Sequence, residues 1–223
     1  MVFSSMRSFQ TISAFFSFLF LLMPTIGVAH PSPGRVELVP EVEAVSVTST
    51  PIKYRFYLKD KGDDGQGSTL LGDSDLSVSH EKILHMIVYD PSLKEFQHVH
   101  PTFVNGGWEV DLNFTVNGDY WVWAQGVLKA NGKEFSGGSN LGVSGGAPAW
   151  PLPPVLGDVR KGNDGASVAE LSTTTIHAQQ MVMLTLTFTR NDTVAPLITN
   201  YLGAFAHIVA VPSDADSMVH VHA

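Results

Sequence analysis

The chain has 223 residues, of which 44% are hydrophobic and 15% charged, and its formal net charge is −8. This composition is typical of a globular chain and not of a disordered one, and the acidic balance argues against nucleic acid or an anionic membrane surface as a partner. Because the sequence contains no cysteine, both a disulfide framework and a thiolate metal site are excluded. Any metal site must therefore use nitrogen, oxygen or thioether sulfur.

The first 29 residues have the pattern of a secretory signal peptide. Arg7 is the only charged residue before an apolar run at residues 14–23, which is too short to span a bilayer. Gly27-Val28-Ala29 supplies small residues at the expected cleavage positions. We therefore expect a secreted or periplasmic protein that begins at His30 and has no membrane span after cleavage, with an uncleaved anchor as the alternative. As an N-terminal residue, His30 could also chelate Cu(II) through its amine and its imidazole.

Residues 30–144 are expected to form a first β module, because segments rich in β-branched and aromatic residues alternate with turn sequences. The expected strands cover residues 36–39, 43–47, 52–58, 83–89, 96–100, 108–113, 119–125 and 140–143. Residues 108–113 and 119–125 are expected to pair through the turn dipeptide Asn117-Gly118, and residues 127–140 to form a hairpin-like loop. Trp121 and Trp123 would share one face, for which core packing is the main interpretation and a sugar-stacking platform the alternative.

A proline-rich segment at residues 145–157 predicts a semi-rigid linker. It leads into a second, shorter β module at residues 158–223, with strands expected at 167–172 and 180–190. No amphipathic helix pattern of useful length is present, so the predicted fold class is all-β with two sandwich-like modules. The second module has no counterpart of residues 108–125, which would expose a strand edge. That edge could be covered by the first module or by another subunit in a homodimer, or the chain could be truncated.

Two stretches of the chain repeat one pattern built on histidine. Each reads as a strand, a turn of six residues and a second strand that ends in His-Val-His. His85 precedes His98 by 13 positions, and His207 precedes His220 by the same number. The candidate metal ligands are His85, His98 and His100 in the first hairpin and His207, His220 and His222 in the second.

Antiparallel pairing about a symmetric turn predicts that His85 lies opposite His100, and His207 opposite His222. His98 shares a face with His100 because side chains alternate along a strand. Directly opposed Cβ atoms lie about 5 Å apart and diagonal ones about 7 Å, so three imidazoles converge in each hairpin and form a candidate site for copper or zinc. The alternative is that these histidines form hydrogen bonds within the fold or mark a protein interface. The pattern leaves open whether the clusters form two sites or one shared site.

Enzyme activity is not expected. His80-Glu81 followed by His85 resembles the His-Glu-X-X-His motif of zinc proteases, but the second histidine comes one position too late and lies in a strand. No Gly-X-Ser-X-Gly motif is present, and the candidate general bases near the first hairpin are Glu81, Asp90 and Glu95. The leading hypothesis is a secreted metal-binding protein, copper ahead of zinc, that holds or delivers ions. The alternative is a metal-free interaction or adhesion module.

The segment Tyr201–Val209 followed by His220-Val221-His222 resembles a pattern in secreted or periplasmic bacterial proteins that often occur near heavy-metal resistance systems. Residues 80–85 with 96–101 are similar to the partner module of those proteins. The resemblance covers most of residues 50–130 and 180–223. It implies an immunoglobulin-like β fold and a metal role, but no particular activity. In that family the second His-Val-His is usually followed by proline and two further strands, whereas here Ala223 follows it.

Overall fold

The computed structural model describes residues 35–47, 49–149, 161–163, 167–172, 185–190, 199–200, 203–211 and 218–222. The predicted signal peptide, His30 and residues 150–157 of the predicted linker lie outside this set. The described residues form β-strands and one short 3-10 helix, η1 (Asp73–Asp75), which confirms the all-β prediction. Within the same residues, no helix is long and apolar enough to cross a membrane.

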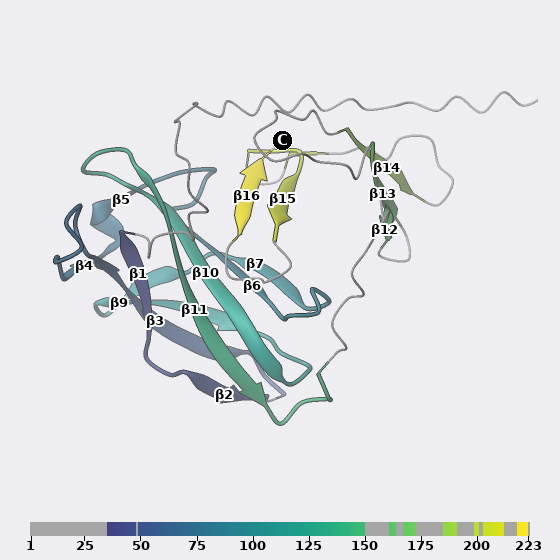
Figure 1. Cartoon of the computed structure of the whole chain (residues 1–223), viewed down its shortest axis with the longest axis horizontal. Helices are drawn as coiled ribbons and strands as arrows, with labels where there is room; N and C mark the ends of the chain where they lie inside the picture. The colour runs from purple at the N-terminus through teal and green to yellow at the C-terminus, as the bar shows by residue number, and fades with distance from the viewer. Residues whose placement is uncertain are drawn as a thin grey trace, which may run out of the picture. The chain divides into compact units, whose positions relative to one another are not determined.

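The first part of the chain builds two sheets (Figure 1). One has the order β1-β3-β9-β8 with β4 paired to β3, and the other the order β2-β11-β10-β6-β7 with β5 paired to β10. The strands of the first sheet are β1 (Val36–Pro40), β3 (Ile52–Asp60), β4 (Thr69–Leu71), β8 (Thr102–Val104) and β9 (Gly107–Leu112). Those of the second are β2 (Ala44–Ser46), β5 (Leu76–Ser77), β6 (Leu84–Tyr89), β7 (Phe96–Val99), β10 (Gly118–Leu128) and β11 (Glu134–Ser144). All pairs are antiparallel except β2 with β11.

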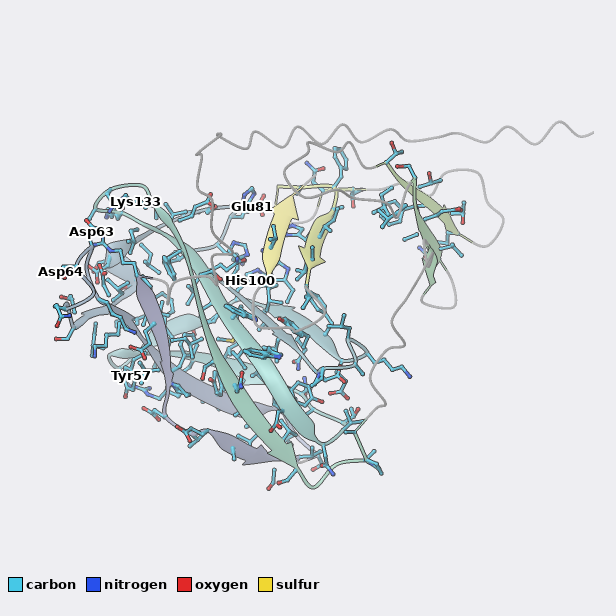
Figure 2. The ribbon with its side chains drawn as sticks, in the orientation of Figure 1. Tyr57, Asp63, Asp64, Glu81, His100 and Lys133 are labelled. Atoms are coloured by element: carbon cyan, nitrogen blue, oxygen red, sulfur yellow. The ribbon has the colours of Figure 1, made fainter. Side chains whose placement is uncertain are left out.

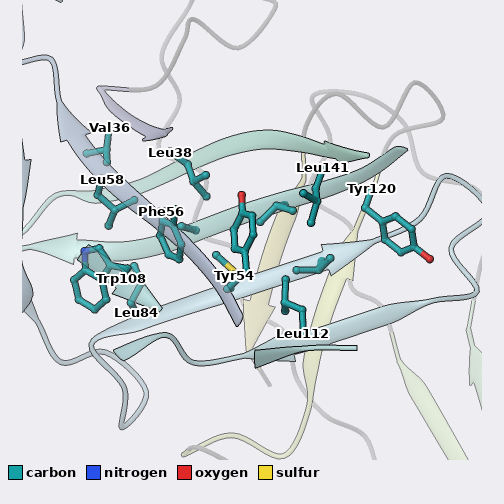
Figure 3. Packing of buried hydrophobic residues seen from close by; sticks show 14 of the residues in the cluster. Val36, Leu38, Tyr54, Phe56, Leu58, Leu84, Trp108, Leu112, Tyr120 and Leu141 are labelled. Carbon is teal, nitrogen blue, oxygen red and sulfur yellow. The ribbon is translucent and has the colours of Figure 1, made fainter. Parts of the chain in front are cut away.

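One hydrophobic core lies between these two sheets. Alternate residues of β3 and of β10 are fully buried in it, as expected for strands with one face inward. Figure 3 shows how the large side chains from the two sheets meet. The largest of them include Tyr54, Phe56, Leu58, Trp108, Leu112, Tyr120 and Leu141.

The predicted pairing of residues 108–113 with 119–125 is wrong. β9 pairs with β3 and β8, whereas β10 pairs with β6 and β11 in the other sheet. The connecting segment crosses between the sheets because Phe114 and Val116 enter the core, where they are 5% and 2% exposed. The Tyr120 hydroxyl secures this crossing, because its single proton is shared between the carbonyl of Val116, at 3.1 Å, and the Glu95 carboxylate. Burial of those apolar side chains outweighs the local turn preference of Asn117-Gly118.

The expected hairpin at residues 127–140 is present, but its loop is shorter than expected. β10 and β11 are each 11 residues long and pair from Gly118–Val143 to Val127–Glu134, so this region is mostly strand. Glycine makes the close packing possible at Gly137, where a Cβ would lie 2.7 Å from the carbonyl oxygen of Val36. After β11, the backbone N–H of Ala147 donates to the Thr115 carbonyl, so hydrogen bonding within this part of the chain extends to residue 147.

The later part of the chain forms two small sheets. β12 (Lys161–Asn163), β13 (Ser167–Leu171) and β14 (Leu186–Arg190) make an antiparallel three-stranded sheet. β15 (His207–Ala210) and β16 (Val219–His222) make a two-stranded sheet. The strand predicted at residues 167–172 is confirmed, and the one predicted at 180–190 is confirmed over its second half, since residues 180–184 lie outside the described set.

Candidate metal centre

The hairpin of β6 and β7 positions the first three histidines. Its register pairs Met86 with Val99 and Ile87 with His98, so one further step places His100 opposite His85, as predicted. Met86 is fully buried in the core and Val99 packs against it. His85, His98 and His100 alternate with these inward residues and therefore share the opposite face of the sheet. Since Met86 points away from them, its thioether is not part of the cluster.

The turn of this hairpin is held by Asp90, which is 3% exposed. Its carboxylate accepts hydrogen bonds from the backbone N–H groups of Ser92 at 3.1 Å and of Lys94 and Glu95 at 2.9 Å, and from the Ser92 hydroxyl. The backbone N–H of Asp90 donates to the Glu95 carbonyl at 3.2 Å. These bonds satisfy a buried carboxylate and close the six-residue turn in one conformation. They thereby set the strand register, on which the convergence of the histidines depends.

The three imidazoles of the first hairpin converge on a common point. One ring nitrogen from each of His85, His98 and His100 lies within 4.8 Å of the other two. The ring centroids are 5.4 Å apart for His85–His98 and 5.0 Å apart for the other two pairs. Imidazoles bound to one tetrahedral ion, with metal–nitrogen bonds of about 2.0 Å, would have centroids about 5 Å apart. The residues could therefore hold a metal ion after small side-chain rotations.

A backbone carbonyl determines which nitrogen of His85 faces this point. The Nε2 atom lies 3.0 Å from the Ser79 carbonyl oxygen, which can only accept, so Nε2 carries the proton. The Nδ1 atom then presents its lone pair toward His98 Nε2, 3.1 Å away. Metal-binding histidines commonly donate their second ring N–H in this way, which fixes the tautomer and raises the basicity of the ligand nitrogen.

The surface around the cluster is aromatic and polar. β10 lies next to β6 and pairs Gln125 with His85 and Trp123 with Ile87. Trp121 and Trp123 share this face, as predicted, and their rings stack at 6.1 Å. The predicted core packing of these tryptophans is wrong, because the intervening residues of β10 fill the core and leave both indoles half-buried on the outer face. Trp123 Nε1 donates to the Tyr89 hydroxyl at 3.0 Å, which ties β10 to β6 on that face.

The second hairpin repeats the histidine pair of the first. His207 Nδ1 lies 3.4 Å from His220 Nε2, and the ring centroids are 5.6 Å apart with an interplanar angle of 36°. The corresponding angle for His85–His98 is 34°, and the same two atoms, Nδ1 and Nε2, face each other there. The backbone of His222 belongs to β16, but its side chain and residues 212–217 of the turn lie outside the described set.

Two features of the first site were missed in the sequence. Ser79 contributes through its backbone carbonyl. Every residue type has this group, so the sequence gives no signal for it. Asp90 belongs to the predicted six-residue turn and to the candidate general bases, but its side-chain hydrogen bonds were not predicted. An aspartate followed by Pro and Ser at the start of a turn is a known signal for such bonds to the following backbone N–H groups. Figure 2 labels His100 of the cluster and Glu81 of the turn that begins at Ser79.

The C-terminal part of the chain matches a known family model. Residues 161–223 match a family described as a domain of unknown function (DUF8832), and this range contains the second histidine hairpin. No curated protein and no solved structure matches the chain.

Proposed function

We propose that the protein binds a transition-metal ion through His85, His98 and His100, and that its role is to hold or deliver such ions. The convergence of three ring nitrogens within 4.8 Å carries this proposal. The His85–Ser79 hydrogen bond supports it, because it turns the Nδ1 lone pair toward the other two rings. Imidazole is a ligand for both copper and zinc, and divalent copper generally binds more tightly than zinc at a given nitrogen site. Copper is therefore placed ahead of zinc.

We propose that the second hairpin binds metal as well, through His207, His220 and His222. Support comes from the 13-residue spacing shared by the two hairpins and from the matching geometry of the two histidine pairs.

A binding role is proposed rather than a catalytic one, because two of the three carboxylates near the first hairpin are engaged in the fold. Asp90 accepts the turn hydrogen bonds described above. Glu95 accepts hydrogen bonds from the Tyr120 hydroxyl and from the side chain and backbone of Thr115. A general base has to be able to reach the proton that it removes.

We further propose that residues 36–144 form an immunoglobulin-like sandwich. Support comes from the strand order of the two sheets and from the Tyr120–Val116 hydrogen bond, which resembles the tyrosine corner of that fold.

We also propose that the protein is secreted or exported to a periplasm, which the N-terminal signal pattern supports. The mass of the mature protein recovered from that compartment tests this proposal. The expected N-terminus is His30, and an intact residue 1–29 segment would contradict the proposal.

Calorimetric titration of the mature chain with Cu(II), Cu(I) and Zn(II) tests metal binding. We expect at least one ion to bind with a dissociation constant below about 10 μM. The double variant His98→Ala/His100→Ala should lose the tightest binding, whereas a variant at two exposed charges far from the site in sequence, Asp63→Asn/Asp64→Asn, should keep it. Weaker binding of every ion by the wild type, or unchanged binding by the histidine variant, would overturn the proposal.

A further inference from the structure

The turn that precedes the first hairpin brings another histidine to the site. Ser79 and Lys82 exchange two backbone hydrogen bonds, of 2.8 and 3.1 Å, and enclose His80 and Glu81. Both enclosed residues have positive φ, 48° and 66°, as in the type I′ turns that close two-residue hairpins. This turn supplies the Ser79 carbonyl that orients His85, and it places the His80 ring centroid 6.4 Å from that of His85.

Two adjacent left-handed residues without glycine make an uncommon backbone arrangement. Asn-Gly or Asp-Gly is the usual sequence of such a turn, because glycine adopts positive φ without steric cost. Backbone strain of this kind persists where surrounding contacts hold the residues in place, and it is often found at binding sites. Here the strained residue carries an imidazole beside a cluster of three more.

We propose that His80 is the fourth ligand of the first site, which then holds a divalent ion in an all-nitrogen, four-coordinate shell with His85 Nδ1, His98 and His100. This inference rests on the proposed metal-binding function. The His80 side chain is exposed, so it can rotate without breaking core packing. The separation from His85 has to shorten from 6.4 Å to about 5 Å, the value for two imidazoles on one tetrahedral ion.

The second hairpin can be compared with the first to test this assignment. His80 lies five positions before His85, and the residue five positions before His207 is Leu202. The second hairpin therefore has no imidazole at the equivalent position. Zinc in closed protein sites is almost always four-coordinate, so a fourth imidazole should favour retention of Zn(II) or Cu(II) at the first hairpin over the second. Cu(I), which three-coordinate sites also satisfy, should gain little from it.

Substitution of His80 with asparagine tests the proposal. Asparagine tolerates positive φ and keeps the turn, while it removes the imidazole. Glu81→Asn is the matched control, since it makes the same exchange at the neighbouring left-handed position. We expect His80→Asn to weaken Zn(II) binding by about tenfold or more, as even second-sphere changes at metal-binding histidines do. Cu(I) affinity should stay within about twofold, and Glu81→Asn should leave both affinities unchanged.

Long-range proton–nitrogen NMR of the histidine rings in the Zn(II)-loaded wild type identifies the ligand atoms directly. We expect metal-induced shifts at one ring nitrogen of His80, and at Nδ1 rather than Nε2 of His85. If the wild type binds no metal, the proposed function fails. If it binds metal through His85, His98 and His100 while the His80 nitrogens do not shift and His80→Asn retains full Zn(II) affinity, only the fourth-ligand inference fails.

Discussion

The two histidine hairpins contain the same pair of rings in different surroundings. His85–His98 and His207–His220 bring Nδ1 and Nε2 together at 3.1 and 3.4 Å. β6 lies inside a six-stranded sheet with β10 and β7 as neighbours, whereas β15 and β16 form a sheet by themselves. The pair therefore follows from the spacing within a hairpin, and around the first pair the described residues add the Ser79 carbonyl, the Asp90 turn and the aromatic face of β10. We expect the first hairpin to bind metal more tightly, because β6 is held between two neighbouring strands and the Ser79 carbonyl orients His85.

Removal of the ligands should have the largest effect. His98→Ala/His100→Ala should abolish the tighter phase of a Zn(II) or Cu(II) titration, a loss of at least about a hundredfold in affinity, since two ligands are lost. His220→Ala/His222→Ala should remove only a weaker phase. Calorimetry of both variants measures this, with circular dichroism as the folding control. A tighter phase that survives in the first variant, or disappears in the second, would contradict the assignment of the tighter site to the first hairpin.

Lowering the pH from 7.5 to 5 should weaken binding at both hairpins. Imidazole must be neutral to donate its lone pair to a metal, so protons compete with the ion. We expect the apparent affinity to fall by about tenfold or more at each site and to recover when the pH is restored. Competition with a chelator of known affinity measures it at each pH. An affinity that does not change with pH would exclude histidine as the principal ligand.

Loss of the turn carboxylate should affect the first hairpin alone. Asp90→Ala removes the carboxylate that accepts hydrogen bonds from the backbone N–H groups of Ser92, Lys94 and Glu95, and we expect a loss of about 2–3 kcal/mol in the free energy of unfolding. Metal affinity at the first hairpin should fall because its register is less restrained, while the second hairpin is unaffected. Urea denaturation and titration measure the two effects, and Asp64→Ala, at an exposed aspartate, is the control. Unchanged stability would contradict the assigned role of Asp90.

The smallest effect is expected on the aromatic face. Trp123→Phe removes the hydrogen bond to Tyr89 and should cost about 1 kcal/mol of stability. Metal affinity should change by less than about twofold, because Trp123 lies opposite Ile87 and not opposite a proposed ligand. Thermal unfolding measures the loss of stability, and metal titration measures the change in affinity. A larger change in affinity would mean that Trp123 contributes to metal binding at the first hairpin.

The sequence alone was sufficient for the all-β class, for most strand positions and for the face shared by His85, His98 and His100. These features depend on alternation with period two and on a symmetric turn, both of which are local. Sequence patterns did not show which strands pair across the sheets: residues 108–113 and 119–125 looked like a hairpin and lie in different sheets. The outward direction of Trp121 and Trp123 was missed for the same reason, because either face of an alternating strand can be the buried one.

Local spacing thus determined that the histidines can meet, and the tertiary structure decided how they meet. Alternation along a strand and the length of a turn are properties of the covalent chain. The ring atom that His85 presents depends on a carbonyl six residues earlier, the turn depends on a buried carboxylate, and the position of His80 depends on a strained two-residue turn. Those contacts join backbone groups to the side chains of Asp90 and His85, and they exist only once the chain has folded.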